Sequence, residues 1–459
     1  MSSAQETITS ELGTRAQGTR PGDARLVLVI EGEHPLEKPI AVSLRDVDVV
    51  EIGRGAAREI RRVPRHVAIS VADGRVSTAH AKLTAEGDGW VVVDAGSKNG
   101  MFLNGTRVLR GKLAPGDTIR CGEVLFMMTA GGPPLASDGS AAGPVNELAS
   151  FAPAMADVVA TVPRIARGDI AVLVHGETGA GKEIVASAIH ELSGRRGRFV
   201  AVNCAALPAT LFEAELFGYR KGAFSGATAA HEGFVRAADD GTLLLDEIGE
   251  LRAESQAALL RMLEQGEVVP VGETTPVRTN ARIIAATNVE LEQAVHADEF
   301  RRDLFARLAG FVVRVPPLRA RLEDLGLLVA ALLRKVAPDQ AAQLRLGPGV
   351  VAALAAHRWP DNIRELRNAL HAASLLATDG VITVDMLPPA VRSPAPPSAP
   401  TPSAAPPAPP ADDPQGKLEA ALARHAGNLA AVARELGKDP KQIRRWLEMY
   451  GIDVAKYRG

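Results

Sequence analysis

Aromatic residues, cysteine and long apolar runs are all scarce in this chain. Phe, Trp and Tyr make up 4% of its 459 residues, and its two cysteines are Cys121 and Cys204. Two distant cysteines are too few for a disulfide framework or a metal cluster, which suits a reducing compartment. The first residues lack an apolar signal core, and no segment approaches the ~20 apolar residues of a membrane span. We therefore expect a cytoplasmic protein that has no membrane contact.

An excess of charge of either sign is also missing. The 54 acidic and 52 basic side chains give a formal net charge of −2. No overall basic field therefore draws the protein onto nucleic acid, and any such contact must be local. A hydrophobic fraction of 46% and a charged fraction of 23% are typical of a globular protein. The length exceeds what a single core supports and is ordinary for roughly three domains.

Two segments rich in Gly, Pro and small residues divide the chain. Residues Gly131 to Pro144 are small and polar, which indicates a linker. Residues Ser393 to Pro414 hold 10 of the 31 prolines, which predicts an extended, semi-rigid spacer.

The residue patterns around these joints predict different fold types. Runs such as LVLVI and WVVVD alternate with Gly, Asp and Asn turns before the first joint, which is typical of an all-β sandwich. After it, apolar strands alternate with helical stretches, as in a parallel α/β sheet. From about Pro317 the pattern is helical only, which suggests a lid. The predicted parts are a disordered tail (1–24), an all-β domain (25–130), a linker (131–144), an α/β subdomain (145–316), a helical lid (317–392), a Pro/Ala-rich linker (393–414) and a small all-α domain (415–459).

The stretch VLVHGETGAGKE predicts a phosphate-binding loop. An apolar strand precedes Gly176-x-x-x-x-Gly181-Lys182, and a helical stretch follows, which is the context that makes this motif credible. The glycines let backbone N–H groups turn toward phosphate, the helix N-terminus adds positive dipole, and Lys182 supplies a charge for the β- and γ-phosphates. The predicted nucleotide-binding residues are Gly176, Glu177, Thr178, Gly179, Ala180, Gly181, Lys182 and Glu183.

A second element supports an ATP site. The strand GTLLLDE ends in Asp246 and Glu247, which suit a carboxylate that holds Mg²⁺, directly or through water, and a base that polarises water. Glu183 stands where Ser or Thr usually ligates the metal, so that hydroxyl is missing. A plain glycine turn beside a solvated acidic strand end is the competing interpretation, and the two elements together disfavour it. We expect ATP and Mg²⁺ as cofactors.

Eight ordered motifs carry a family resemblance over roughly Val145 to Arg392. They are GETGAGKE, NCAAL, ELFGYRKGAFSGA, GTLLLDEI, RIIAATN, FRRDLFARL, VPPLRAR and WPDNIRELRN. In this order they resemble the AAA+ domain of bacterial enhancer-binding proteins, the activators of sigma-54 RNA polymerase. The phosphate loop of that family also ends in Glu, in agreement with Glu183. The resemblance implies an ATP-hydrolysing domain whose partner is sigma-54 RNA polymerase.

The resemblance assigns roles to further residues by motif. It implies that Asn203 couples Glu247 to the γ-phosphate, and that Arg301 and Arg307 are arginine fingers that reach the nucleotide of the neighbouring subunit. Such arginines stabilise transition-state charge in trans, so the active form would be a homo-oligomeric ring, expected to be a hexamer. Outside such a motif, an exposed arginine ordinarily makes only a surface ion pair. The sensor residues would be Thr287 and Asn288 in the first sensor and Arg364 in the second.

The glycine-rich stretch GYRKGAFSGATAA is similar to the GAFTGA signature of the same family, a mobile loop that contacts the sigma factor. Phe224 would be its exposed apolar anchor, and Ser225 stands where Thr is usual, which keeps the hydroxyl and loses a methyl group. The predicted sigma-54 contacts are Gly222, Ala223, Phe224, Ser225, Gly226 and Ala227.

The motifs EIGRG, VSTAHA and DAGSKNGMFLNG resemble the forkhead-associated (FHA) domain, a phosphothreonine-binding sandwich, over about residues 25–129. The resemblance implies that Arg54 and Ser77 hold the phosphate and that Asn99 binds the backbone of the peptide. Thr78 stands where a phosphate-side Arg or polar residue is common, and Lys98 replaces that charge. A sandwich used only for docking is the alternative. His80 would be a buried structural histidine.

The last 45 residues carry nine Lys/Arg against five Asp/Glu. They read as a helix, a turn at Gly437 and a second helix capped by Asp439, with Ile443 and Leu447 on one apolar face. This pattern resembles the Fis-type helix-turn-helix of the same activators, whose second helix enters the major groove. A plain solvated basic helix is the alternative. The predicted DNA-contacting residues are Lys441, Gln442, Arg444 and Arg445.

These features together predict a multidomain regulator: an all-β FHA sandwich, an AAA+ α/β P-loop domain with a helical lid, and a small all-α helix-turn-helix. Its predicted function is to bind enhancer DNA, hydrolyse ATP and remodel sigma-54 polymerase, under the control of a phosphothreonine-containing partner. Two alternatives are a phosphopeptide adaptor with a vestigial ATPase and an AAA+ remodeller of another target. The intact Lys182, Asp246, Glu247, Arg301 and Arg307 disfavour the first, and GAFSGA disfavours the second.

Overall fold

The structure is a computed structural model that describes residues 24–392 apart from Ala209, together with some positions between Leu418 and Val454. The chain forms two compact units, residues 1–394 and 395–459, and each is described by itself. Most of the predicted tail and the Pro-rich spacer lie outside the described residues. So do the predicted DNA-contacting residues Lys441, Gln442, Arg444 and Arg445.

The N-terminal part of the larger unit is a sandwich of two six-stranded sheets. One sheet has the order β2-β1-β12-β11-β8-β9 and the other β10-β7-β6-β3-β5-β4. Within these sheets β3 and β5 run parallel, and the other neighbouring strands pair antiparallel. The strands of the first sheet are β1 (Ala24–Glu31), β2 (Ile40–Ser43), β8 (Met101–Leu103), β9 (Thr106–Val108), β11 (Thr118–Cys121) and β12 (Val124–Ala130). Those of the second are β3 (Val47–Arg54), β4 (Glu59–Val63), β5 (Arg65–Val71), β6 (Ala81–Glu86), β7 (Gly89–Asp94) and β10 (Arg110–Leu113).

Alternating side chains build the core of this sandwich. In β5 the residues Val67, Ile69 and Val71 are buried, whereas those between them are partly exposed. This period of two is what a half-buried strand requires. The inward side chains of both sheets meet Trp90 and Phe126 in one core. The all-β prediction for the N-terminal domain is confirmed.

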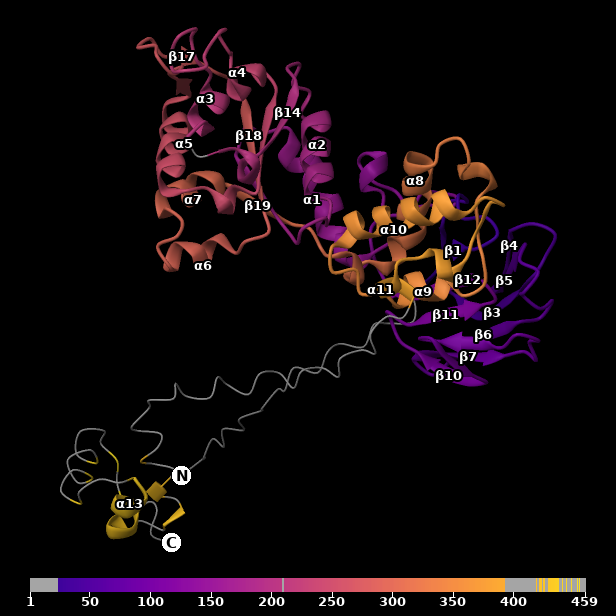
Figure 1. Cartoon of the computed structure of the whole chain (residues 1–459). Helices are drawn as coiled ribbons and strands as arrows, with labels where there is room; N and C mark the ends of the chain where they lie inside the picture. Colours follow the sequence, from indigo (N-terminus) through magenta and orange to yellow (C-terminus); the bar gives the residue numbers. More distant parts are fainter. Residues whose placement is uncertain are drawn as a thin grey trace, which may run out of the picture. The chain divides into compact units, whose positions relative to one another are not determined.

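The central part of the larger unit is a five-stranded parallel sheet of order β14-β15-β18-β13-β19. Helices α1 and α2 pack on one face, and α3, α5 and α7 pack on the other (Figure 1). The strands are β13 (Val172–His175), β14 (Phe199–Asn203), β15 (Thr242–Asp246), β18 (Arg282–Thr287) and β19 (Phe311–Arg314), and a hairpin joins β16 (Glu267–Val268) to β17 (Val277–Arg278). The helices are α1 (Ala156–Ala166), α2 (Lys182–Ser193), α3 (Phe212–Phe217), α4 (Phe234–Ala237), α5 (Ala253–Gln265), α6 (Leu291–His296) and α7 (Arg302–Leu308). The predicted α/β class is confirmed, and the carboxyl ends of its strands meet at one edge, where ligands bind in such sheets.

The lid follows the sheet and is mainly helical. Two short 3₁₀ turns, η6 (Leu318–Ala320) and η7 (Leu322–Asp324), lead into α8 (Leu325–Val336), α9 (Val350–Ala356), α10 (Asn362–Leu376) and α11 (Pro389–Arg392). The sequence predicts helices only, but β20 (Arg345–Leu346) and β21 (Val381–Ile382) form a parallel pair. Two residues per strand are too few to produce a recognisable strand period, which is why the pattern misses them.

The lid and the N-terminal sandwich share one hydrophobic core. Val27 and Val29 of β1 are buried against Leu325, Val329 and Leu333 of α8, and Figure 1 shows the lid helices beside β1 and β12. This contact is not among the predictions made from the sequence. Its signal lies in β1, where almost every side chain is buried, because a strand that is apolar on both faces must be covered on both.

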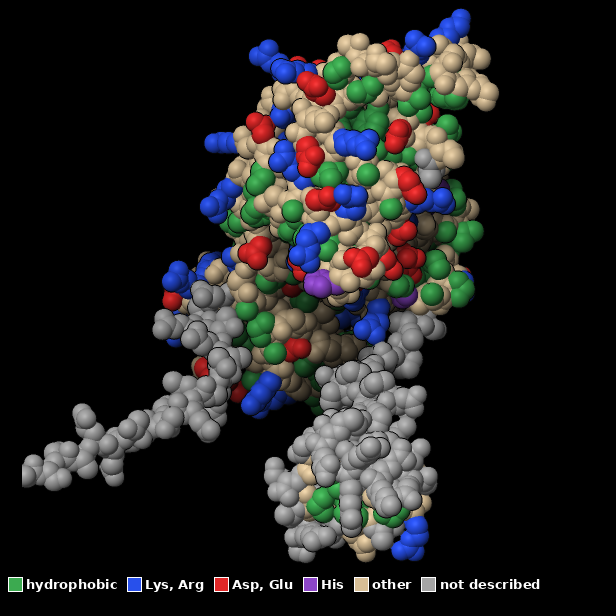
Figure 2. Space-filling view, turned by 90° about the vertical axis from the view of Figure 1, so that its left-hand side faces the viewer, with side chains coloured by type: hydrophobic (Ala, Val, Ile, Leu, Met, Phe, Trp, Pro, Cys, Tyr) green, Lys and Arg blue, Asp and Glu red, His purple; other side chains and the backbone are tan. Residues whose placement is uncertain are grey.

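Acidic and basic side chains are interspersed over the face of the larger unit shown in Figure 2, as the net charge of −2 leads one to expect. In the smaller unit the structure describes α13 (Leu429–Glu435) and a small core in which Ile443 and Leu447 are buried, as their spacing predicts. Within the described parts of the chain, no helix combines the length and the apolar character needed to cross a bilayer.

Candidate nucleotide and phosphopeptide sites

The predicted phosphate loop joins β13 to α2. Gly179 and Gly181 have φ angles of 72° and 103°, a left-handed conformation that favours glycine. A Cβ on Gly179 would lie 2.3 Å from the carbonyl oxygen of Asp361, so the loop also touches the lid directly. Lys182 is buried under the loop, where its Nζ donates hydrogen bonds to the carbonyl oxygens of Gly176 at 3.0 Å and Glu177 at 3.3 Å. The ammonium group is therefore held by loop carbonyls at the beginning of α2.

The predicted acidic pair ends the neighbouring strand β15. Asp246 accepts a hydrogen bond from the backbone N of Glu247 at 3.0 Å. Glu247 has a φ of 54°, an unusual value for a residue with a side chain. Its Oε2 is buried, and nothing among the described residues bonds it. A buried, unpartnered carboxylate oxygen at the edge of a cavity is suited to holding a water molecule.

The residues predicted to sense the γ-phosphate lie on the adjoining strands. Asn203 pairs with Asp246 in the sheet register, and its Oδ1 accepts hydrogen bonds from the backbone N atoms of Ala205 and Ala206. Asn288 donates from Nδ2 to Thr178 Oγ1 at 3.1 Å. Thr287, which is fully buried, accepts a hydrogen bond at Oγ1 from the backbone N of Val289 at 3.0 Å. Asn288 therefore bonds the phosphate loop through its side chain, and Thr287 bonds it through its backbone carbonyl oxygen, which accepts from the backbone N of Gly176 at 3.1 Å.

A cavity of about 280 Å³ brings the α/β subdomain and the lid together. The subdomain supplies the phosphate loop, Lys182, Asp246 and Glu247, and the predicted second sensor Arg364 lines the lid side. The lid residues Leu332, Lys335, Ile363 and Arg367 complete this wall. A loop of backbone N–H groups, several cations and two carboxylates fit the phosphates and the metal ion of a Mg²⁺ nucleotide.

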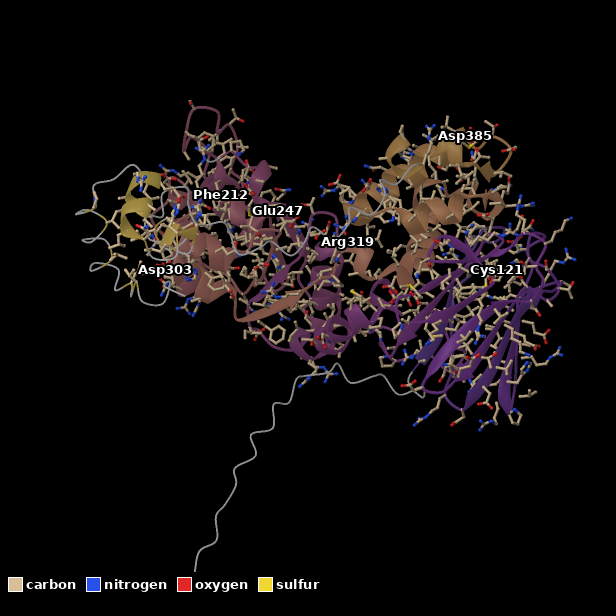
Figure 3. All side chains as sticks on the ribbon, turned by 90° about the horizontal axis from the view of Figure 1, so that it is seen from below. Cys121, Phe212, Glu247, Asp303, Arg319 and Asp385 are labelled. Atoms are coloured by element: carbon tan, nitrogen blue, oxygen red, sulfur yellow. The ribbon has the colours of Figure 1, made fainter. Side chains whose placement is uncertain are left out.

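Three lid side chains hold the phosphate loop from outside the cavity. Arg319 donates to Glu177 in an ion pair, and this contact lowers the pKa of the Glu177 carboxyl to about 2. Figure 3 labels Arg319 and Glu247. Asn362 is fully buried and donates to the Thr178 carbonyl oxygen at 3.0 Å, and Arg321 donates to the Ala180 carbonyl oxygen.

The predicted arginine fingers lie away from this cavity. Arg301 forms an ion pair with Asp303 at 2.7 Å and is half exposed. Arg307 donates from Nε and Nη2 to the carbonyl oxygen of Leu263. Neither arginine lines the cavity of its own chain. The structure therefore does not bring the fingers to the nucleotide site within a single chain, and their role in trans stays a prediction.

The GAFSGA loop forms a compact turn. The backbone N of Gly222 donates to the Ala227 carbonyl oxygen at 2.8 Å, and Gly222 and Gly226 have φ angles of 83° and 119°. The Phe224 ring is 37% exposed and meets Tyr219 edge to face, with 5.0 Å between ring centroids. Ser225 beside it is exposed. The glycines thus form an ordered turn that presents an aromatic ring to solvent.

The predicted phosphopeptide residues lie on loops at one end of the sandwich. The backbone N of Arg54 donates to the Ser77 carbonyl oxygen, and the backbone N of Lys98 donates to Ser77 Oγ, both at 3.0 Å. Asn99 donates from Nδ2 to the Arg75 carbonyl oxygen at 2.7 Å. The predicted ligand residues exposed there are Arg54, Thr78, Lys98 and Asn99.

His80 holds these loops from below. It is fully buried, its Nδ1 accepts from the backbone N of Ser77 at 3.0 Å, and its Nε2 lies 3.2 Å from the Gly100 carbonyl oxygen. Burial lowers the pKa of its imidazole, so the ring is neutral at pH 7. The structural role predicted for His80 is confirmed.

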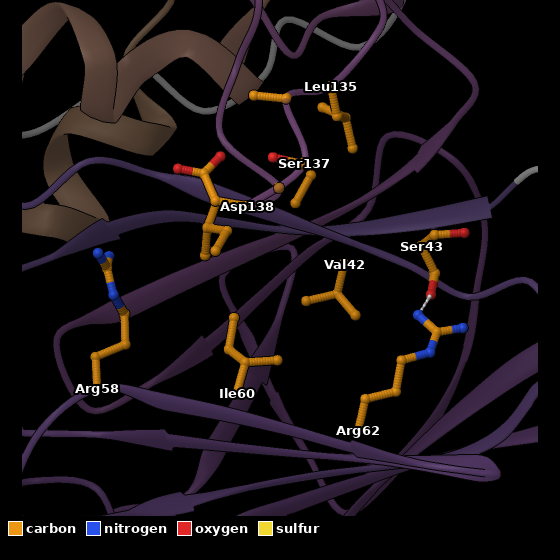
Figure 4. A pocket seen from close by; sticks show the side chains of 12 residues that line it. Val42, Ser43, Arg58, Ile60, Arg62, Leu135, Ser137 and Asp138 are labelled. Carbon is orange, nitrogen blue, oxygen red and sulfur yellow. Dashed lines mark hydrogen bonds between the residues drawn. The ribbon is translucent and has the colours of Figure 1, made fainter.

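A separate groove of about 530 Å³ opens between the edge strands β2 and β4 of the sandwich (Figure 4). Arg62 lines it but donates to the carbonyl oxygens of Ser43 and Arg45 at 2.9 and 2.8 Å. Arg58 lines it too, and pairs with Glu31 at 3.0 Å. Both guanidinium groups thus tie the two sheets together, and no predicted ligand residue lines this groove.

Three family models match this chain. The model described as "Sigma-54 interaction domain" matches residues 148–314, "AAA+ ATPase lid domain" matches 319–404, and "FHA domain" matches 50–122. The chain carries a sigma-54 interaction domain. It carries the AAA+ lid after that domain and the FHA domain before it.

Relatives of this sigma-54 interaction domain protein are regulatory proteins. The acetoin catabolism regulatory protein of Cupriavidus necator is 46% identical over 305 residues, which are 64% of this chain and 45% of that protein. The Nif-specific regulatory protein of Azotobacter vinelandii is 43% identical over 314 residues, 68% of this chain and 60% of that one. The chain thus spans about half the length of these curated relatives. The crystal structure of NtrX from Brucella abortus is 32% identical, covers 67% of this chain and 70% of that chain, and has a TM-score of 0.50.

Several residues of the sigma-54 interaction domain and its lid escape the sequence analysis. Arg319, Arg321 and Asn362 lie inside the quoted motifs VPPLRAR and WPDNIRELRN, but these motifs alone do not tell which arginine or amide contacts the phosphate loop. Lys335 carries no motif signal, because it reaches the cavity only through the packing of α8.

Proposed function

We propose that this chain is a sigma-54-dependent transcriptional activator. It binds enhancer DNA, assembles into a ring of expected hexameric order and uses ATP hydrolysis to convert closed complexes of sigma-54 RNA polymerase into open complexes. A phosphothreonine-containing protein regulates it through the FHA domain. We keep the predicted division into domains and the predicted cytoplasmic location as parts of this proposal.

The cavity between sheet and lid carries the proposal, because charges of complementary kinds converge there. Lys182 neutralises the β- and γ-phosphates, aided by the backbone N–H groups of residues 176–183. Asp246 holds Mg²⁺, directly or through water, and the metal ion supplies further charge to the phosphate oxygens. Glu247 polarises the attacking water with the carboxylate oxygen that has no bond among the described residues. Arg364 contacts the nucleotide from the lid.

Catalysis is completed by a neighbouring subunit. Arg301 and Arg307 line no part of the cavity of their own chain, and Arg301 is half exposed on the surface. Such exposure suits an arginine that reaches the γ-phosphate of the next subunit and stabilises charge as the bond breaks. Asn203, Thr287 and Asn288 report the state of the γ-phosphate to the rest of the domain.

The turn that bears Phe224 is the part of the ATPase domain that acts on the partner protein. An exposed aromatic ring framed by glycines is an anchor that a partner protein can bury. We assign the contact with sigma-54 to residues 222–227. The buried Lys182 and the bonded network around it argue against the alternative of a vestigial ATPase.

The domains on either side of the ATPase bind the regulatory ligands, which are a phosphothreonine peptide and DNA. At the FHA domain, Arg54 and Ser77 bind the phosphate of phosphothreonine, with Lys98 and Thr78 beside them, and Asn99 binds the peptide backbone. At the C-terminus, Lys441, Gln442, Arg444 and Arg445 of a helix-turn-helix contact DNA. The local basic excess among the last 45 residues supports this assignment.

Transcription in vitro tests the proposal. Purified full-length protein, sigma-54 polymerase and a supercoiled template that bears an upstream binding site should yield transcripts only with ATP. The same template read by polymerase that carries another sigma factor is the control. ATP hydrolysis without sigma-54-dependent transcripts would favour another remodelling target, and the absence of hydrolysis would favour the phosphopeptide adaptor.

A further inference from the structure

The FHA domain lies directly on the lid helix α8. A Cβ on Gly326 would come within 1.7 Å of the Val29 carbonyl oxygen, so α8 touches the backbone of β1. Val29, Val329 and Leu333 are fully buried around this contact. These side chains belong to one buried apolar cluster that is shared by the FHA domain and the lid.

Polar contacts hold the rim of this interface. The backbone N of Leu346 donates to the Gly32 carbonyl oxygen at 2.7 Å, and the backbone N of Gly349 donates to Glu123 Oε1 at 3.0 Å. Arg345 lies 3.8 Å from Glu33. On the FHA side, these partners belong to the loop after β1 and to the turn between β11 and β12.

The same rim continues into the predicted phosphopeptide loops. Glu33 also pairs with Arg75 at 3.4 Å, and the Arg75 carbonyl oxygen accepts the hydrogen bond of Asn99. Asp73 accepts at one oxygen from the backbone N of Arg75 and at the other from the backbone N of Glu123, at 2.7 and 2.8 Å. One residue, Arg75, therefore separates Asn99 from the side chains that hold the lid.

Helix α8 reaches the nucleotide cavity as well. Leu332 and Lys335 line that cavity, while Gly326, Val329 and Leu333 of the same helix contact the FHA domain. A 12-residue helix is a rigid element. A shift of the FHA domain on α8 therefore moves one wall of the nucleotide site.

We propose that phosphopeptide binding at the FHA domain and nucleotide binding at the AAA+ cavity are energetically coupled through α8. The inference rests on the proposed phosphopeptide and nucleotide sites and adds the route that connects them. Peptide binding engages Asn99, alters its hold on Arg75, and so changes how the FHA domain lies on the lid. By thermodynamic linkage, each ligand changes the affinity for the other by the same factor, typically about 5- to 150-fold.

The test uses the full-length protein and two labelled probes. One is the phosphothreonine peptide that binds best from an oriented library, with its unphosphorylated form as control, and the other is a fluorescent ATP analogue that is not hydrolysed. The peptide Kd with and without saturating Mg²⁺–nucleotide should differ at least about fivefold. The nucleotide Kd with and without peptide should differ by the same factor. Equal values would overturn the coupling and leave the phosphopeptide function standing, whereas failure to prefer the phosphorylated peptide would refute that function itself.

Variants at the interface locate the route. Gly326→Leu forces α8 away from β1 and should bring the coupling factor to about one, whatever it does to the Kd of either ligand alone. Ala331→Leu adds a leucine at an exposed position of the same helix and should keep the coupling. Coupling that survives in Gly326→Leu would overturn the proposed route.

Two milder substitutions test the proposed route if Gly326→Leu does not fold. Glu33→Gln weakens the link between Arg75 and Arg345 and should reduce the coupling factor. Glu37→Gln alters a carboxylate on the same loop. Among the described residues its ion pair is with Arg58, inside the FHA domain, so this variant should leave the factor unchanged. Equal coupling in both variants would contradict the proposal.

Discussion

Arg319 of the lid and Glu177 of the phosphate loop form an ion pair, with 2.7 Å between Arg319 Nη1 and Glu177 Oε2. Asn362 donates to the same carboxylate oxygen at 3.1 Å. These contacts fasten the lid to the loop that we propose binds the phosphates. The nucleotide site and the lid therefore move together.

We expect the Arg319–Glu177 pair to contribute to the stability of the folded protein by an amount that does not change with pH near neutrality. Because Arg319 lowers the pKa of Glu177 to about 2, the stabilisation is complete above the usual carboxyl pKa near 4.5 and disappears as the pH falls toward 2. Arg319→Met should lower the melting temperature by about 1 to 3 °C, because both side chains are partly exposed. The difference from wild type should be constant between pH 6 and 9. Arg278→Met, which removes an exposed pair with Glu267, is the control, and a difference that varies across this range would refute the assignment.

The ATPase residues should separate binding from hydrolysis. Lys182→Ala should weaken nucleotide binding at least about 10-fold, because a charged partner of the phosphates is lost. Glu247→Gln should still bind ATP but turn over about 100- to 10,000-fold more slowly. Equilibrium binding of a fluorescent nucleotide and phosphate release measure the two effects. Normal hydrolysis by either variant would disprove these roles.

Catalysis between subunits predicts complementation. Arg307→Ala alone should lose about 1,000-fold or more in turnover, and Glu247→Gln alone should be nearly inactive. Mixed rings of the two variants contain interfaces with an intact Glu247 and an intact Arg307, so phosphate release should partly recover. Undiminished turnover by a confirmed monomer of the native protein would rule out fingers in trans.

The FHA domain should distinguish phosphothreonine from threonine. Arg54→Ala removes a guanidinium at the edge of the proposed phosphate site and should weaken phosphopeptide binding about 10- to 100-fold. Arg65→Ala, which removes an exposed arginine at the opposite end of β3 and β5 from Arg54, is a control for charge. If the wild type binds phosphorylated and unphosphorylated peptides equally in anisotropy titrations, the domain is a docking module only.

The sequence carries most of the fold because its patterns are local. The period of two in β5 and the order of strand, glycine loop and helix around Lys182 follow from neighbouring residues. The contact of α8 with β1 is different, because periodicity tells which face of an element is apolar but not which element covers it. Gly326 touches the backbone of Val29. Because these residues lie almost 300 positions apart, no local pattern in the sequence indicates the contact.

The residues of the nucleotide site also differ in whether the sequence alone predicts their role. Lys182 belongs to one motif and Asp246 and Glu247 to another, and the chemistry of both can be inferred from residue type and spacing. Lys335 reaches the cavity only through the packing of the lid, and Asn362 reaches Thr178 through a left-handed backbone with a φ of 54°. Tertiary contacts of this kind leave no pattern in the chain.

Phe224 carries the central claim, which is that ATP hydrolysis acts on sigma-54 polymerase. Its ring is exposed, framed by Gly222 and Gly226, and does not line the nucleotide cavity. Phe224→Ala should therefore leave ATP turnover within about twofold. Loss of an aromatic anchor that sigma-54 buries should reduce open-complex yield more than about 10-fold. Ser225→Thr, which restores a methyl group beside the ring, is the matched variant and should keep or raise the yield.

The most direct test is to measure ATP turnover and open-complex yield in the same reaction, for wild type and Phe224→Ala, on a sigma-54 promoter. The account predicts that Phe224→Ala hydrolyses ATP normally, fails to open the promoter and is not trapped with sigma-54 by a transition-state analogue of ATP. Normal promoter opening by Phe224→Ala would contradict it.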